Sequence, residues 1–330
     1  MTRAALPLLW LLWLLVLLLW LLELEVGPAT INVFTALADW INNSDSVARI
    51  ILQEVRVPRA LLALLTGASL AISGAALQGL LRNPLASPDL LGISQTAALL
   101  AVCVLYFGWS QRAWWLLPLA ALLGAALAVL LLLQLTRKLP GTHSLILAGL
   151  ALTALTSALT TFALSFAPNP YALQEAYFWL LGSVANRSLS DVAIALPFML
   201  LGSALLLSCG RALDALSLGE DTAASLGFPL ARYRWRLIIG VACNIGAAVA
   251  VSGCIGFVGL IVPHLLRPLC GAQPGRLLWW SLPGGAALVL LADALVQLVP
   301  ASQELQLGVL TALLGGPFFL LLLLQQRSER

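Results

Sequence analysis

Residues 56–92 read RVPRALLALLTGASLAISGAALQGLLRNPLASPDLLG. Between Arg59 and Arg82 lie 22 residues without a charge, slightly more than the ~20 that an α-helix needs to cross the hydrocarbon core of a bilayer. Pro84 and Pro88 follow, and a proline disfavours helical geometry in the residue before it. The segment therefore predicts a membrane-spanning helix that ends near Arg82.

Small residues recur along this predicted helix. Gly67, Ala71, Ala75 and Gly79 stand four residues apart, which places them on one face. Such a small-xxx-small stripe lets two helices approach closely where lipid provides no hydrophobic drive for association. We therefore expect this helix to pack against protein.

The composition of the whole chain indicates an integral membrane protein of the all-α class. Of 330 residues, 61% are apolar and 9% are charged, against about 25% charged in soluble domains. We expect a single transmembrane domain over residues 1–330, in which 1–49 hold the first span and an extracytoplasmic loop and 210–236 form a cytoplasmic loop. The first span is expected to be retained, because it lacks a small-residue cleavage site. Ten spans are predicted, at residues 4–22, 60–81, 90–111, 113–136, 142–166, 192–209, 237–253, 254–267, 277–299 and 305–325, the eighth as a half-length helix.

The distribution of basic residues predicts the orientation. When the ten spans alternate between the two sides, twelve Lys and Arg residues fall on the side of the termini and five on the other. Cytoplasmic loops carry the excess of positive charge. Both termini should therefore be cytoplasmic.

Motifs for catalysis are missing from the sequence. There is no GxxxxGK[ST], no HExxH and no GxSxG, and the five cysteines contain no CxxC pair. A phosphate-cradling loop or a hydrolase site needs those residues at those spacings. We expect a transport subunit that is not an enzyme, with no catalytic residue and no cofactor or metal bound by this chain.

Two polar features inside the apolar runs allow alternative interpretations. Thr153, Ser157 and Thr161 repeat at four-residue spacing, which indicates either a weakly polar pathway wall or hydroxyls bonded to their own helix. Asp293 could be a proton relay, which would make the chain a proton-coupled secondary transporter. Its place sixteen residues beyond Leu277, ~24 Å by helical rise, favours a structural role at the outer interface.

Several long motifs point to a known family. They are R-x-P-R at 56–59, RNPLASPDLLG at 82–92, GFVGLIVPHLLRPLCG at 256–271 and LGVLTALLGGPFFLLLL at 307–323. From about residue 56 to the C-terminus the chain resembles the FecCD/BtuC-type permeases of binding-protein-dependent ABC importers for ferric siderophores, haem and cobalamin. The resemblance implies the type II ABC importer permease fold in the bacterial inner membrane. It also implies a homodimer with two ATP-binding subunits that carry ATP and magnesium, a solute-binding protein outside, contact with lipid and no contact with nucleic acid.

The family also suggests a cargo and an ATPase contact. A ferric siderophore is the first expectation for the cargo, with cobalamin or haem as the alternative. In the family the cytoplasmic loop after the sixth span couples to the ATPase. The residues that would do so here lie in two short helical segments: Leu213, Leu216, Leu218, Gly219, Glu220, Ala223, Leu226 and Gly227.

Three further roles follow from the resemblance. Arg56 and Arg59 would dock the binding protein, although they could instead snorkel to headgroups or pair with Glu54. Relatives often carry Arg four residues after the acid at 293, where this chain has Gln297. The cytoplasmic gate would consist of Asn83, Leu85, Thr142 and His143, and the pathway lining of Thr153, Ser157 and Thr161.

Overall fold

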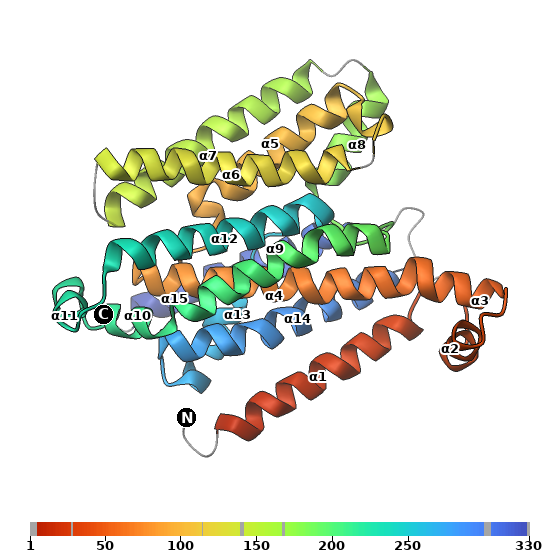
Figure 1. Ribbon diagram of the computed structural model, residues 1–330, viewed down its shortest axis with the longest axis horizontal. Coiled ribbons are helices and arrows are strands. Elements are labelled where there is room, and N and C mark those ends of the chain that lie inside the picture. Colours follow the sequence, from red (N-terminus) through yellow and green to blue (C-terminus); the bar gives the residue numbers. More distant parts are fainter. Residues whose placement is uncertain are drawn as a thin grey trace.

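The computed structural model describes residues 5–27, 29–113, 115–138, 142–166, 169–299 and 305–328. All regular structure in these ranges is helical (Figure 1). The elements are α1 (Ala5–Glu25), α2 (Val33–Ile41), α3 (Val47–Ile50), η1 (Ile51–Arg56), α4 (Val57–Leu81), η2 (Pro88–Leu91), α5 (Ile93–Tyr106), η3 (Trp109–Gln111), α6 (Leu116–Lys138), α7 (Thr142–Ser165), α8 (Pro170–Leu180), α9 (Leu189–Ser208), α10 (Gly210–Leu216), α11 (Glu220–Ser225), α12 (Leu230–Ser252), α13 (Val258–Leu266), η4 (Pro268–Cys270), α14 (Pro274–Leu298) and α15 (Leu307–Ser328).

The all-α prediction is confirmed, and each of the ten predicted spans coincides with a helix. In the described ranges seven helices are long and apolar enough to cross a membrane. α5 and the apolar part of α15 are shorter, and α13 has nine residues. The number ten is therefore approximate as a count of full spans.

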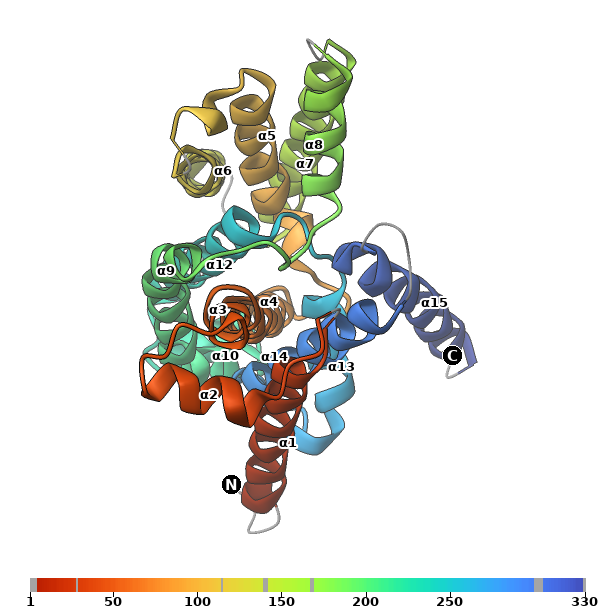
Figure 2. The same cartoon turned by 90° about the vertical axis from the view of Figure 1, so that its right-hand side faces the viewer.

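α4 is the central helix of the bundle. Viewed along the bundle, α9, α12, α13 and α14 surround it (Figure 2). A Cβ added at Gly67 would lie 2.2 Å from the carbonyl oxygen of Gly285 on α14, and one at Gly74 would lie 1.8 Å from that of Gly259 on α13. Gly67 belongs to the predicted small-residue stripe, which therefore brings the backbones of α4 and α14 into contact. Gly74 lies outside the stripe and allows the same close approach between α4 and α13.

α4 begins earlier than expected. The chain is helical without interruption from Val47, through the π-helix η1, to Leu81, whereas the sequence predicted an extracytoplasmic loop up to residue 49 and a span from residue 60. Pro58 cannot donate a backbone hydrogen bond, and the amide of Val57 bonds instead to the carbonyl of Leu52, five residues back. The π-helix, with its wider turn, continues into Pro58 without a break. Residues 47–49 of the predicted loop and residues 50–59 are therefore helical.

The half-length helix α13 is confirmed. Gly253 to Phe257 before it is not helical, and other segments of the bundle pack closely on this irregular backbone. A Cβ added at Gly253 would lie 2.0 Å from the carbonyl oxygen of Trp179, and one at Gly182 would lie 2.4 Å from that of Cys254. Non-helical backbone at membrane depth is tolerated only where protein covers it.

The two ends of the bundle differ. α1 begins and α15 ends at the end that carries α10 and α11, whereas α2, α3 and α8 lie at the opposite end (Figure 1). α7 and α15 project from the bundle (Figure 2). Both expose large apolar side chains in the single chain, among them Leu147, Leu155, Phe162, Leu313 and Leu320.

Candidate functional site

Five hydroxyl groups of α7, those of Thr153, Thr156, Thr160, Thr161 and Ser165, donate to backbone carbonyls. Thr153 Oγ1 donates to the carbonyls of Gly149 at 2.9 Å and of Asp89 at 3.1 Å, and Thr161 Oγ1 donates to that of Ser157 at 3.0 Å. Thr153 and Ser157 are half-buried and Thr161 is exposed. Since the threonine protons are used internally, this face of α7 offers oxygen lone pairs and methyl groups, which make a neutral, weakly polar wall.

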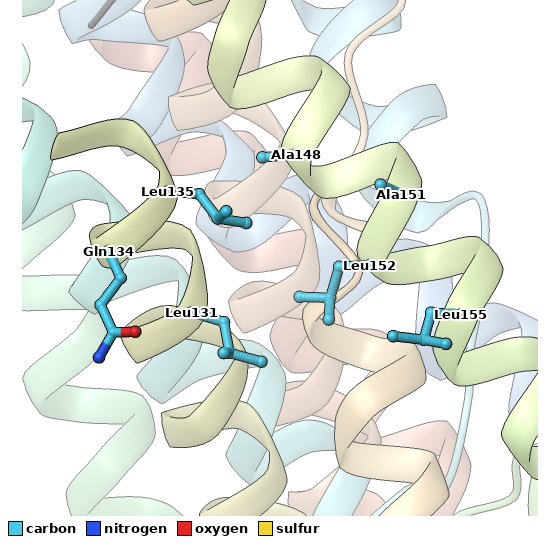
Figure 3. Close-up of a pocket in the computed structure, with 7 residues that line it drawn as sticks. All are labelled: Leu131, Gln134, Leu135, Ala148, Ala151, Leu152 and Leu155. Atoms are coloured by element: carbon cyan, nitrogen blue, oxygen red, sulfur yellow. The ribbon is translucent and has the colours of Figure 1, made fainter. Parts of the chain in front are cut away.

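A cavity of about 520 Å³ lies between α6 and α7 (Figure 3). Leucine and alanine side chains line it, and Gln134 is the polar member of the lining. None of the predicted pathway residues belongs to that lining. The cavity offers little that could orient a polar cargo.

The predicted ATPase-coupling residues divide into two groups. Leu213 and Leu216 are only 1% and 4% exposed, because α10 packs on α4 and α14. Leu218 and Leu226 are 66% and 59% exposed. The expectation that Leu216 faces a partner is therefore wrong: both buried leucines belong to the core, and Leu218 and Leu226 remain available at the surface.

The other coupling positions shape the loop. Gly219 and Gly227 have φ values of +112° and +84°, which favour glycine, and Ala223 is buried. Glu220 pairs with Arg234 on α12 at 2.7 Å. The α10–α11 loop is thus held in a defined conformation against the bundle.

The two predicted docking arginines are buried. Arg59 forms a bidentate pair with Asp293 on α14, at 2.6 and 3.0 Å, and lies 3.8 Å from Glu23 on α1. Arg56 donates to the carbonyls of Leu24, Glu25 and Ala29. The sequence placed both side chains at a surface, but the ends of α1, α4 and α14 that lie near α2 and α3 enclose them.

Glu23 and Gln297 complete this charge network, and sequence analysis assigned neither to it. Gln297 Nε2 donates to Glu23 Oε1 and, at 3.3 Å, to Asp293 Oδ2. Asp293 therefore has the structural role that its depth favoured. The signal for Glu23 was its position as the first charge after an uncharged run.

The gate residues are only partly described. Asn83 is exposed and its Oδ1 accepts the amide of Leu85 at 2.9 Å, which fixes the turn after α4. Leu85 is half-buried. Thr142 and His143 begin α7, and their side chains lie outside the described residues. Contact of these groups across a dimer axis stays a prediction.

A second cavity, of about 560 Å³, opens beside α8 at the end that holds α2 and α3. Its polar lining includes Glu175, Asn186 and Arg187, and sequence analysis did not find it. Burial lowers the pKa of the Arg187 guanidinium, and Asp191 partly opposes that shift.

Metal binding is not indicated by the side chains of the described residues. They contain no group of three His, Cys, Asp or Glu side chains that could hold an ion.

The seven long apolar helices of the described ranges, packed around a central helix, indicate a multi-pass membrane protein. Residues 14–325 match the model of the FecCD transport family, and the chain belongs to that family. It is therefore the permease of a type II ABC importer, which confirms the predicted family and fold class.

Individual relatives agree with this assignment. The chain is 40% identical over 314 residues to the vitamin B12 import system permease protein BtuC of Salmonella paratyphi A, a match that covers 92% of this chain and 94% of the relative. The BtuC protein of Salmonella typhi matches to the same extent. A solved structure described as an inward-facing metal-chelate type ABC transporter superposes with a TM-score of 0.84 at 33% identity, over 97% of this chain and 99% of that one.

Proposed function

We propose that two copies of this permease enclose the pathway of an ATP-driven importer for a bulky metal chelate. The observation that carries the proposal is the wall of α7, which from Thr142 to Ser165 contains no Asp, Glu, Lys or Arg and ties its threonine protons to its own carbonyls. A bare ion needs dense oxygen ligands or rings of charge. A chelate that carries its own ligands needs only a wide and neutral passage.

For the cargo, a cobalamin is supported by the 40% identity to vitamin B12 permeases. A ferric siderophore, the first expectation from sequence, is supported by the likeness to a metal-chelate type transporter. Both are large chelates, and the α7 wall suits either.

The partners follow from the two ends of the bundle. We propose that two ATPase chains, which hold ATP and magnesium, bind the α10–α11 loops through Leu218 and Leu226. A solute-binding protein would dock at the end with α2, α3 and α8. Arg56 and Arg59 lie at that end, but they would act there through the network that positions the outer helix ends, because their side chains have internal partners.

The proposed location is the bacterial inner membrane, with both termini in the cytoplasm. The excess of Lys and Arg on the side of the termini supports this orientation. The beginning of α1 and the end of α15 lie at one end of the bundle (Figure 1), as an even number of crossings requires.

The test is uptake by proteoliposomes that contain the permease, its ATPase and its binding protein. We expect uptake of radiolabelled cyanocobalamin or of a ferric siderophore that requires internal ATP. Preference for cyanocobalamin would establish the corrinoid as cargo, and preference for the iron complex would establish the siderophore. Uptake driven by a proton gradient without ATP would contradict the proposal and favour a secondary transporter.

A further inference from the structure

A small polar cavity lies at the end of the bundle that carries the α10–α11 loop. Its volume is about 190 Å³. It is enclosed by the last two turns of α4, the end of α13, the first turn of α14 and the loop after α10. The lining consists of Ala75, Gln78, Gly79, Arg82, Ser217, Arg267, Ala272, Pro274 and Leu277, and it contains two cations and no carboxylate.

Hydrogen-bond donors outnumber acceptors in this lining. Gln78 is 2% exposed, and its Oε1 accepts from Arg267 Nη2 at 2.6 Å. Its Nε2 amide and the Nε of Arg267 have no partner among the described residues. Ser217 donates its proton to the carbonyl of Asp214. Because buried donors in native proteins are almost always paired, the unpartnered Gln78 amide and Arg267 Nε point to a ligand with acceptor oxygens.

Helix dipoles explain only part of this arrangement. Arg82 follows the C-terminus of α4 and Arg267 that of α13, where cations are favoured. The helix dipoles do not explain why Gln78 Nε2 and Arg267 Nε have no hydrogen-bond partner among the described residues. The N-terminus of α14 is already engaged, because the amide of Gly275 donates to Asp214 at 2.7 Å. The two guanidinium groups and the buried amide are therefore the groups that could recognise a ligand.

We propose that this cavity binds a phosphate-type oxyanion between Arg82, Arg267 and Gln78. Guanidinium groups match the geometry of phosphate oxygens. Two sources have this chemistry: a free phosphate group in the adjoining aqueous phase, and the headgroup of an acidic phospholipid, for which basic pockets between membrane helices are suited. Ser217 belongs to the loop after α10, so the bound anion joins α4 and α13 to the coupling loop.

The experiment uses the full chain in phosphatidylcholine nanodiscs. Inorganic phosphate, titrated against chloride at constant ionic strength, should raise the Tm in a saturable way. Arg82→Gln should bind phosphate about tenfold more weakly, as expected for the loss of one charge-assisted contact. Arg82 is exposed, so this variant should fold. Arg267→Lys, which keeps the charge but loses the planar fork, should also bind more weakly.

Arg276→Gln is the matched control, since Arg276 lies in the first turn of α14 but not in the cavity lining. It should bind phosphate like the parent chain. If nanodiscs with phosphatidylglycerol raise the Tm without phosphate and abolish the phosphate response, the ligand is the lipid headgroup; if only phosphate acts, it is the soluble anion. The proposal is overturned if neither raises the Tm, or if Arg82→Gln and Arg276→Gln respond alike. Uptake assays do not enter this test, so its failure would leave the transport function untouched.

Discussion

Buried charges at the end of the bundle that holds α2 and α3 show how single residues hold three helices together. Glu23, Arg59 and Asp293 come from α1, α4 and α14, and Gln297 connects the two carboxylates. α1 is otherwise mostly exposed. The network and the hydrogen bonds from Arg56 to the carbonyls of Leu24 and Glu25 are therefore polar ties between the first helix and the bundle.

Removal of Arg59 should be strongly destabilising. Arg59→Met leaves two carboxylates buried without their cation, and breaking a buried ion pair costs about 3–5 kcal/mol. The double variant Arg59→Met/Asp293→Asn should be more stable than Arg59→Met alone, because one uncompensated charge is gone. Thermal unfolding in nanodiscs measures both, and Arg112→Met, at an exposed position, is the control. A double variant less stable than the single one would contradict the network.

Gly74 should tolerate no side chain. The added Cβ of Gly74→Ala would meet the backbone of Gly259 at 1.8 Å, so α4 and α13 would have to separate. We expect a loss of about 3 kcal/mol, the upper range for overpacking. Gly256→Ala is the control, since a Cβ there would meet nothing within 4 Å. Equal Tm values for the two variants would show that the close approach is unimportant.

At the scale of elements, the α10–α11 loop combines a buried side with an exposed one. Leu213 and Leu216 fix α10 to α4 and α14, and Leu218 and Leu226 extend from the loop. The carboxylate of Asp214 binds the start of α14. Because Asp214 links the loop to α14, a force applied to Leu218 or Leu226 would also act on α14.

Substitutions in this loop should separate assembly from stability. Leu218→Asp and Leu226→Asp should abolish co-purification of the ATPase without a change in the Tm of the permease, because both side chains are exposed in the isolated chain. Leu216→Asp should lower the Tm instead, since it buries a charge. Leu173→Asp, on exposed α8 at the other end, is the control for co-purification. Normal ATPase binding by both exposed variants would exclude this surface.

For the whole molecule, α7 and α15 expose large apolar side chains in the single chain, and the proposed dimer would cover them with a second copy. With the native cysteines replaced, Asn83→Cys or Leu85→Cys should form a disulfide between two copies in the closed state and arrest uptake. Trp109→Cys, an exposed position between α5 and α6, should not cross-link. Non-reducing electrophoresis in each nucleotide state provides the measurement, and the gate assignment fails if no state gives a dimer.

The sequence by itself determined the class of the protein, the ten helical segments, the half-length α13 and the packing stripe on α4. These features depend on hydropathy, prolines and residue spacing, and each of these patterns is complete within one segment of the sequence. The continuous helix through η1 was not predicted, because the charge of Arg59 limits the apolar span, whereas the helix continues beyond that charge.

Only the tertiary structure decided which side chains meet. Arg59 and Asp293 are 234 residues apart, and nothing in their local surroundings indicates the pair. Leu216 and Leu218 lie in the same short apolar segment, yet one is buried and the other is exposed, because neighbouring helices cover one side of the loop. The packing of the helices decides whether a side chain is exposed and which group it contacts. The residue type and its neighbours in sequence therefore do not predict either property.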